Sequence, residues 1–389
     1  MISKQLDQIT IEDLEKLVEN SVSEKKTLEY KSVPLYGSDS ERKEFLADIS
    51  SFANASGGDL IFGVEQSDGI PIKVSGMKIS NIDAEILKLE NIIRDGIEPR
   101  INVLTHAVSV KDGNIALIFR INRSWVGPHR VIFKGHDKFY SRNSAGKYPL
   151  DTNELKIAFT LSQTLVDKIG DFKNGRILDL ISDKTPIPFY NGGKVVLHLI
   201  PLESFNLESS FGLNKLQEVL PKMIPMRTSS WNQKINLEGL LSYSGGQNDK
   251  SHSYVQLYRS GIIEAVEGLT LSKDQEQKVL PSKGYEGMLI KALNKYMEIL
   301  KDLKINPPVA IFLTLLGVNG YRITSSDLFF DSDENNLINK DVLNLPETLV
   351  ENYNISSTSI LRPMFDLVWN ACGFEKSLNF NDGGEWIDK

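Results

Sequence analysis

The stretch Phe52–Glu65, which reads FANASGGDLIFGVE, marks the passage from a helix to a buried strand. Apolar residues recur at helical spacing from Phe45 to Ala53, so the stretch begins inside an amphipathic helix. Gly57 and Gly58 end this helix, because glycine accepts the backbone conformations found at helix C-termini. The apolar run Asp59–Val64 then predicts a strand that is buried within a sheet.

Outward from this stretch, the first 160 residues alternate between helix and strand patterns. Turn and capping residues separate these patterns, and Ser67–Gly69 is an example of a predicted turn. The expected helices cover residues 11–20, 39–56, 80–96 and 151–169, and the expected strands cover residues 27–31, 59–64, 70–74, 101–110 and 114–121. We therefore expect an α+β fold with a mixed sheet and helices in this region.

The second half of the chain predicts another α+β domain. Its expected strands cover residues 194–200, 254–258, 262–266 and 309–316, and its expected helices lie near residues 285–303, 344–352 and 359–371. Residues 204–249 look polar and rich in loops. We expect a first domain over residues 1–165, a connection over 166–190 and a second domain over 191–389.

Composition narrows the class of protein. The chain has 389 residues, 41% of them hydrophobic and 24% charged, with a net charge of −7. No window contains the roughly 18–20 apolar residues of a membrane span, so we expect a cytoplasmic protein with no membrane partner. The single cysteine, Cys372, excludes an internal disulfide and a zinc finger built from several cysteines. A nucleic-acid partner would require a local basic surface, because the whole chain is acidic.

One group of candidate site residues comes from Glu24–Lys31. If residues 28–31 form a strand, Glu29 and Lys31 point to the same face. A carboxylate beside an ammonium suits metal-assisted phosphodiester cleavage, and Glu24 could add a second carboxylate. Glu65 and Asp68, at the end of a buried strand, are further acids of this kind. Solvated charges on an edge strand are the alternative interpretation.

A basic stretch is the second group of candidates. Residues 120–147 contain seven Lys and Arg side chains but one acid, Asp137, and aromatic residues lie between them. Cations with interleaved aromatic rings are typical of surfaces that bind a nucleic-acid strand. The alternative is that these cations pair with the protein's own acids. The candidate RNA-binding residues are Arg120, Arg123, Arg130, Lys134, Lys138, Tyr140, Arg142 and Lys147.

These segments together resemble a known family. The matching parts are Glu24–Lys31, the helix–FANxxGG–strand–GV run at Phe52–Glu65, the Asp68–Gly69 turn, Pro128, and Phe139–Asn143. They are similar to the AlbA-like domain of Schlafen proteins, which many bacterial proteins carry under the label of an ATP- or DNA-binding domain. The resemblance covers residues from about 15 to 160 and none of the second half.

The resemblance implies a function for the site residues. In nuclease-active members, three acids and a divalent cation cleave tRNA-like RNA, and Glu24 and Glu29 match the first two acids. Gln66 occupies the expected place of the third acid, so Glu65 or Asp68 must replace it, and we favour Glu65. The resemblance thus implies Mg²⁺ or Mn²⁺ held by these acids, with Lys31 stabilising phosphate charge.

Two functions follow as expectations. The first is a metal-dependent endoribonuclease that acts on tRNA-like RNA, with a role in defence against phage. The second is a non-catalytic regulator that binds nucleic acid or ATP, although no glycine-rich phosphate loop is present to support ATP binding. The second domain is expected to sense a trigger, to join two chains into a homo-oligomer, or to form a second RNA-binding lobe.

Overall fold

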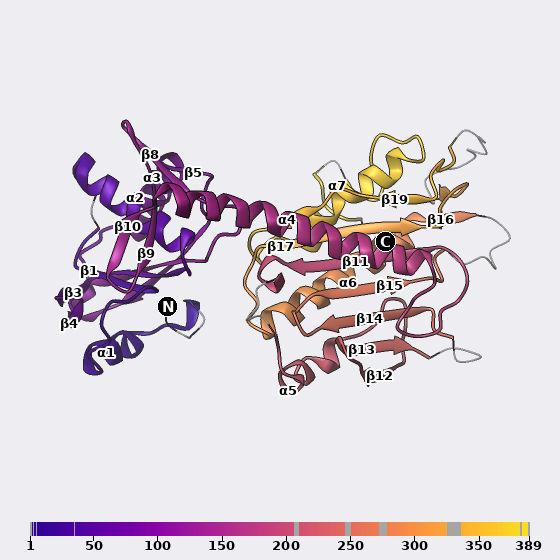
Figure 1. The fold of residues 1–389 in the computed structure, drawn as a ribbon, viewed down its shortest axis with the longest axis horizontal. Helices are drawn as coiled ribbons and strands as arrows, with labels where there is room; N and C mark the ends of the chain where they lie inside the picture. The colour runs from indigo at the N-terminus through magenta and orange to yellow at the C-terminus, as the bar shows by residue number, and fades with distance from the viewer. Residues whose placement is uncertain are drawn as a thin grey trace. The chain divides into compact units, whose positions relative to one another are not determined.

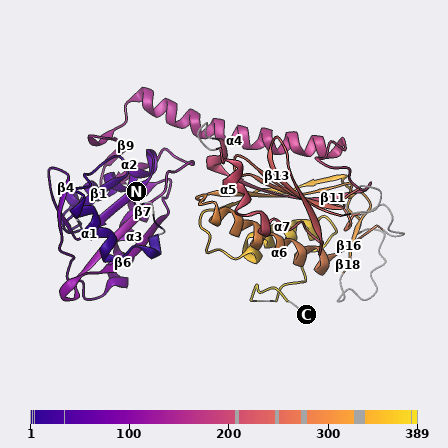
Figure 2. The ribbon, with the colours of Figure 1, turned by 90° about the horizontal axis from the view of Figure 1, so that it is seen from below.

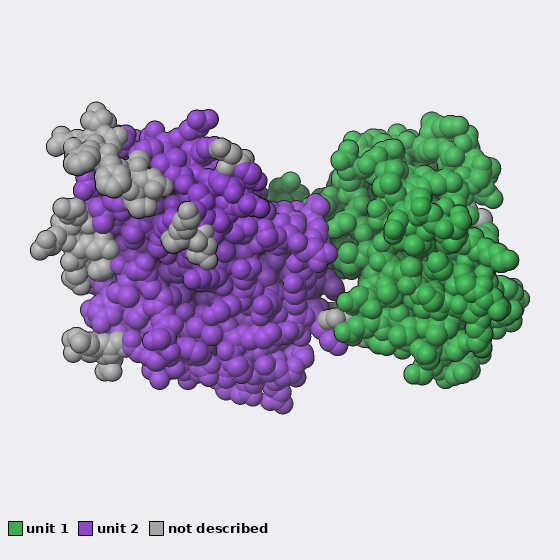
Figure 3. Space-filling view, turned by 180° about the vertical axis from the view of Figure 1, so that it is seen from behind, with its two compact units in different colours: residues 1–166 green, residues 167–389 purple. Residues whose placement is uncertain are grey.

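The chain folds into two compact units (Figure 1; Figure 3). The computed structural model describes residues 1–389 except 1, 3, 5, 35, 206–209, 246–249, 272–277, 325–335, 382 and 388–389, and except the side chain of residue 162. Unit 1 comprises Met1–Val166 and unit 2 comprises Asp167–Lys389. The division falls within helix α4 (Thr152–Ile181). Both units combine helices with β-sheets, which confirms the α+β fold class, and the β1-β2-β7-β6 sheet of unit 1 is mixed.

Unit 1 contains two four-stranded sheets and one hairpin. The strand orders are β1-β2-β7-β6 and β10-β9-β8-β5, and β3 pairs with β4. The helices are α1 (Ile11–Glu19), α2 (Asp39–Asn54) and α3 (Ile82–Gly96). The strands are β1 (Leu28–Lys31), β2 (Gly58–Phe62), β3 (Val64–Ser67), β4 (Ile70–Val74), β5 (Ile97–Glu98), β6 (Val103–Ser109), β7 (Ile115–Ile121), β8 (Arg130–Phe133), β9 (His136–Asn143) and β10 (Gly146–Pro149).

Helix α2 is the central packing element of unit 1. The Ser38 hydroxyl caps its first turn by accepting a hydrogen bond from the backbone N–H of Glu41. Phe45 packs with Phe62 and Phe119 of the first sheet, with ring centroids about 6 Å apart. The other side of α2 contacts β8, β9 and β10 of the second sheet. Because α2 lies between both sheets, its polar side chains can reach residues on either one.

The FANxxGG run has a structural explanation. Asn54 accepts a hydrogen bond from the backbone N–H of His129 and donates to the carbonyls of His129 and Tyr140, so it fastens the end of α2 to β8 and β9. Gly57 has a positive φ of 69°, and a Cβ there would lie 2.7 Å from the backbone of Ile121. A Cβ on Gly58 would lie 2.2 Å from the Phe52 ring. The motif therefore holds the second sheet against α2.

Gly63 changes the course of the chain after β2. The predicted strand over Asp59–Val64 is interrupted there, because Gly63 has a φ of 88° and its N–H donates to the carbonyl of Lys31. The chain then enters the separate β3–β4 hairpin, in which the expected turn at Asp68–Gly69 is present. Residues after Gly63 are thus not a continuation of the buried strand.

Unit 2 is built on an eight-stranded sheet of order β12-β13-β14-β15-β11-β17-β19, with β20 also paired to β17. Its strands are β11 (Lys194–Pro201), β12 (Trp231–Ile235), β13 (Gly239–Ser244), β14 (Ser253–Tyr258), β15 (Ile263–Glu267), β17 (Val309–Leu316), β19 (Val342–Asn344) and β20 (Thr348–Val350), and β16 (Val279–Pro281) pairs separately with β18 (Arg322–Thr324). The helices are α5 (Leu213–Gln217), α6 (Ser282–Asp302) and α7 (Ser357–Asn370).

One helix predicted for unit 2 is wrong, and one predicted loop-rich stretch contains further elements. Residues 344–352 were expected to be a helix, but β19 and β20 lie there as short strands against β17. Pro346 disfavours a helix between them. The stretch 204–249, expected to be polar and rich in loops, also contains α5, β12 and β13 among its described residues.

The two faces of this sheet are covered by different helices, as Figure 2 shows. Alternate residues of β11 divide between two cores: Val195, Leu197 and Leu199 face α6 and α7, whereas Val196 belongs to a core with Ile177 of α4. Within the described residues, no helix is long and apolar enough to cross a membrane.

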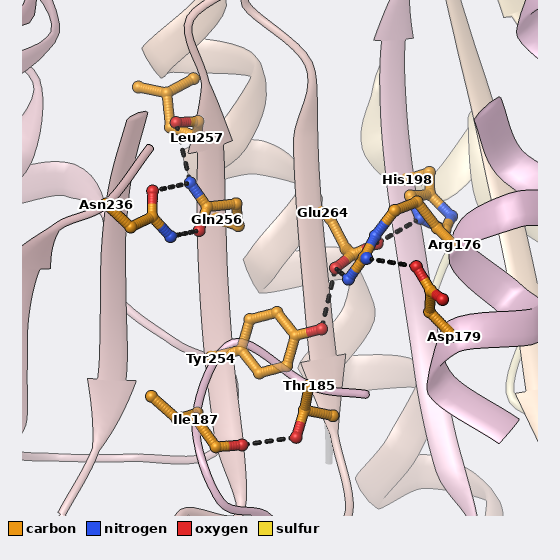
Figure 4. Close-up of polar contacts among 10 residues, drawn as sticks. All are labelled: Arg176, Asp179, Thr185, Ile187, His198, Asn236, Tyr254, Gln256, Leu257 and Glu264. Atoms are coloured by element: carbon orange, nitrogen blue, oxygen red, sulfur yellow. Dashed lines mark hydrogen bonds and ion pairs between the residues drawn. The ribbon is translucent and has the colours of Figure 1, made fainter. Parts of the chain in front are cut away.

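A buried polar network joins α4 to the sheet of unit 2 (Figure 4). Glu264 accepts two hydrogen bonds from Arg176, both 2.9 Å long, one of 2.8 Å from the Tyr254 hydroxyl, and contacts His198 at 2.9 Å. Despite burial, these partners lower the pKa of Glu264 to about 2. A buried carboxylate is tolerated when its lone pairs are used in this way, so the network anchors α4 to β14, β15 and β11.

Candidate active site

The fold assembles a charged group around strand β1. Glu29 is only 8% exposed, and both of its oxygens contact cations: Lys31 Nζ lies 2.8 Å from Oε1, and Arg142 Nη2 lies 2.5 Å from Oε2. Burial alone would raise the pKa of Glu29, but Lys31 and Arg142 lower it below its usual value. Lys31 and Glu29 face the same side of β1, as the alternation of strand side chains predicts.

Asp48 of α2 belongs to the same group. It is 1% exposed, and its oxygens lie 2.6 Å from Lys147 Nζ and 3.7 Å from Lys31 Nζ. Burial, together with the charge of Glu29, raises its pKa to about 6. Glu44, one helical turn earlier, also contacts Lys147. The sequence signal that could have revealed Asp48 is an acid within the apolar face of a helix.

Glu24 lies at the half-buried edge of this group. Its Oε1 accepts a hydrogen bond of 2.9 Å from the backbone N–H of Tyr30, and its own N–H donates to the carbonyl of Gly69. Burial raises its pKa, with a further contribution from the charge of Glu29. We call Glu24, Glu29, Lys31, Asp48, Arg142 and Lys147 the β1 cluster.

The candidates for the third acid lie on the β3–β4 hairpin. Glu65 is exposed and faces Lys73 in the register of the hairpin. Asp68 is exposed in the turn with a φ of 51°, and the Gln66 side chain accepts a hydrogen bond from the N–H of Gly69. Across the part of the chain that the structure describes, no three His, Cys, Asp or Glu side chains are placed to hold a metal ion.

The donor set therefore does not fit the three-acid metal centre that the resemblance implies. Two of the three implied acids, Glu24 and Glu29, lie in the β1 cluster. The charge of Glu29, however, is already compensated by Lys31 and Arg142. A divalent ion prefers several free oxygen ligands. The expectation of Mg²⁺ or Mn²⁺ stays a prediction.

The basic stretch is largely paired with acids of the same unit. Arg120 is buried and contacts Asp59 at 2.7 Å, Arg130 contacts Glu98 and Asp137, and Lys134 contacts Asp39. Arg142 and Lys147 belong to the β1 cluster. Contact between these side chains and RNA stays a prediction, but most of them also form ion pairs with acids of unit 1.

Three of the predicted RNA-binding residues remain on the surface of unit 1 without such pairing. Arg123 stacks on the ring of Trp125 at 4.2 Å. Tyr140 stacks on His136, whose Nε2 lies 2.8 Å from the Tyr140 hydroxyl. Lys138 is exposed and forms no ion pair with any described acid. Stacked rings beside a solvated cation are a surface on which bases can stack.

Comparisons with known proteins connect this geometry to a family. Residues 24–151 match the family model described as Schlafen, AlbA_2. Unit 1 carries a Schlafen AlbA_2 domain. The match includes the whole β1 cluster and confirms the resemblance seen in the sequence. The search of curated proteins found no match.

Two solved structures are similar to part of the chain. The DIP2311 protein of Corynebacterium diphtheriae is 17% identical over 36% of this chain and 26% of its own, with a TM-score of 0.25. The chain thus spans about a quarter of that structure. The N-terminal domain of a Nitrosomonas europaea protein, described as related to the ATP-dependent DNA helicase RecG, is 16% identical over 35% of this chain and 90% of its own, with a TM-score of 0.27.

Proposed function

We propose that the protein is an endoribonuclease that acts on tRNA-like RNA at the β1 cluster. The observation that carries the proposal is the convergence of Glu24, Glu29, Lys31 and Arg142 from β1, its preceding turn and β9. Phosphodiester cleavage requires a group that accepts a proton and cations that stabilise charge on the phosphate. The cluster contains both kinds of group. The AlbA_2 match supports a nucleic-acid-related function.

In this proposal each side chain has a separate task. Glu24 is the half-buried acid whose second oxygen, Oε2, makes no hydrogen bond within the described residues, so it is the candidate proton acceptor. Lys31, which is partly exposed, supplies positive charge for the phosphate, and the buried Arg142 holds Glu29 in place. Asp48 positions Lys31 and Lys147. Lys138 and the Tyr140–His136 pair would contact the RNA outside the cleaved bond. The proposal includes a role in defence against phage.

A second function is favoured by one specific observation. Because Glu29 is held by two cations, and the described residues place no three acids together to hold a metal ion, the cluster also suits a protein that binds nucleic acid without cleaving it. ATP binding has less support, because the glycines of the FANxxGG run follow a helix and pack against other residues.

Incubation of labelled total tRNA with the protein in Mg²⁺, Mn²⁺ or EDTA separates these functions. We expect discrete fragments from the wild type, a loss of at least a hundredfold in rate for Glu24→Gln, and RNA affinity within threefold of wild type. Glu19→Gln, an exposed acid of α1, is the matched control. Binding without fragments in all three conditions would favour the regulator, and fragments that persist in Glu24→Gln would remove Glu24 from the site.

A further inference from the structure

A cavity on unit 1 lies apart from the β1 cluster. It has a volume of about 460 Å³ and is lined by one face of α3, the start of α2 and β8. We call it the α3 cavity, and its lining residues are Arg42, Ala84, Leu87, Lys88, Asn91, Ile92, Asp95, Gly96 and Phe133. Pockets that bind small ligands commonly measure about 300–1,000 Å³. Arg42 is two residues before Glu44, so a helix places these two side chains on opposite sides of α2.

Two cationic side chains line this cavity, and Tyr36 contacts both of them. Arg42 Nε donates a hydrogen bond of 2.9 Å to the carbonyl of Tyr36, and Lys88 Nζ lies 3.9 Å from the centroid of the Tyr36 ring. Tyr36 is itself fixed by a hydrogen bond from its hydroxyl to Glu85. In the described parts of unit 1, neither Arg42 nor Lys88 forms an ion pair with an acid. They differ in this from Arg130 and Lys134 of the basic stretch.

The rest of the cavity is a mixed surface. Phe133 and Ile92 are half-buried, and Leu87 is 58% exposed although it is apolar. Asn91 and Asp95, one turn apart on α3, add an amide and a carboxylate. A ligand that uses all of these groups is planar and apolar on its faces, has hydrogen-bonding edges, and carries an anion at one end. Inorganic phosphate would not use Phe133 or Leu87, and a purely apolar molecule would not use Arg42 or Lys88.

We propose that the α3 cavity binds a nucleoside 5′-phosphate. Arg42 and Lys88 hold the phosphate, because two preorganised cations without acid partners favour an anion. Phe133, Ile92 and Leu87 contact the base, and Asn91 and Asp95 meet its polar edge. The ligand is either a free mononucleotide or an unpaired nucleotide of an RNA strand, since both present this chemistry. The site does not depend on RNA cleavage, so it goes beyond the proposed function.

The test is a calorimetric titration of the full-length protein with 5′-AMP, 5′-GMP, 5′-CMP and 5′-UMP, with adenosine and ribose 5-phosphate as half-ligands, and with a single-stranded pentaribonucleotide. We expect Arg42→Gln and Lys88→Gln each to weaken binding at least tenfold. Leu87→Asp places a negative charge at the cavity and is expected to abolish binding. Because Leu87 is exposed, this variant should fold. Ile72→Asp is the matched control, since Ile72 is 57% exposed on β4 and lies outside the cavity.

The outcomes are distinct. Mononucleotide binding that is lost in Leu87→Asp and kept in Ile72→Asp supports a free nucleotide as the ligand. Binding of the pentaribonucleotide alone, with the same sensitivity, supports a nucleotide within a strand. Three results would overturn the proposal: no binding of either probe, equal affinity for a half-ligand and the whole nucleotide, or binding that Leu87→Asp leaves unchanged. Cleavage of tRNA can succeed or fail independently of each of these results.

Discussion

Arg142 on β9 donates a hydrogen bond to Glu29 on β1 across 113 residues of chain, and both side chains are buried. The guanidinium carbon of Arg142 also lies 3.7 Å from the centroid of the Phe52 ring. Its Nε and Nη1 are buried, and neither has a hydrogen-bond partner among the described residues. Glu29 is therefore the main group that compensates the charge of Arg142, and the pair links the two sheets of unit 1.

This relationship changes the expected effect of Glu29→Ala. If Glu29 were only a metal-ligand carboxylate on a strand face, as the resemblance implies, the substitution would abolish cleavage and leave folding nearly unchanged. The structure predicts a loss of about 3 kcal/mol or more in the free energy of unfolding, because removal of one partner leaves a buried charge without compensation. Chemical denaturation of the whole protein would measure this loss, with the exposed Glu19→Ala as control. Adding Arg142→Met should recover part of the loss. A change below about 0.5 kcal/mol, typical of surface substitutions, would show that the pair does not stabilise the fold.

How much of this site can be predicted from the sequence depends on how far apart in the chain the interacting residues lie. Strand alternation predicted that Glu29 and Lys31 share a face, because that depends on neighbouring residues alone. Capping and spacing likewise predicted α2. Asp48 and its partner Lys147 are 99 residues apart, and no local pattern announces their pairing. The basic stretch was recognised by its charge, but the acids that neutralise it lie on α2, β2 and β5 or face it within β9.

Irregular backbone explains the remaining differences. Gly63 lies inside the apolar run that predicts a strand, and an isolated glycine there indicates a bulge or a close backbone approach rather than the end of the strand. Its positive φ turns the chain out of β2 and into the hairpin, where Glu65 lies opposite Lys73 of β4. In unit 2, the short strands β19 and β20 lack the length that makes alternation visible, so their pairing with β17 could not be read from the sequence.

Lys138 and Arg130 should differ in their effects on RNA binding. Lys138 is exposed without an ion-pair partner in the described structure, whereas Arg130 contacts Glu98 and Asp137 at 2.7 and 3.1 Å. We expect Lys138→Gln to reduce the slope of log affinity against log salt by about 0.7, the value of one phosphate contact to a single strand. Arg130→Gln should change the slope less. Filter binding of labelled RNA between low and physiological salt measures both slopes. Equal reductions would mean that the ion pairs of Arg130 do not compete with phosphate.

Glu286 gives unit 2 a pH-dependent stability. Its carboxylate accepts hydrogen bonds from Trp369, Ser377 and Asn379. Burial outweighs these donors and raises its pKa from 4.5 to about 7. The folded state therefore binds the proton of Glu286 more tightly than the unfolded state does. The resulting stabilisation of the fold is complete below pH 4.5 and is lost as the pH rises to 7. Its size is about 3 kcal/mol, at roughly 1.4 kcal/mol per pH unit.

Thermal unfolding followed by Trp fluorescence between pH 4.5 and 7.5 tests this dependence. Glu286→Gln should flatten the fall in the free energy of unfolding with rising pH. The Asn379 Oδ1 atom, which has no hydrogen-bond partner among the described residues, could accept from the new amide. Glu298→Gln on the same helix is exposed and should keep the wild-type dependence. If both variants keep the wild-type pH dependence of the free energy of unfolding, a group other than Glu286 causes it.

The last prediction concerns the β3–β4 hairpin. Glu65 is exposed opposite Lys73, so Glu65→Gln loses at most a surface ion pair of about 0–1 kcal/mol. Asp68→Asn should keep the turn, because Asn tolerates its φ of 51°. We therefore expect both variants to cleave tRNA within twofold of the wild-type rate, with an unchanged Mn²⁺ requirement. This differs from the expectation that the resemblance implied, in which Glu65→Gln lowers the rate. A tenfold loss in Glu65→Gln with a higher Mn²⁺ requirement, and none in Asp68→Asn, would assign the role of the third acid to Glu65, on the hairpin whose turn already contacts Glu24. The reverse pattern would assign that role to Asp68.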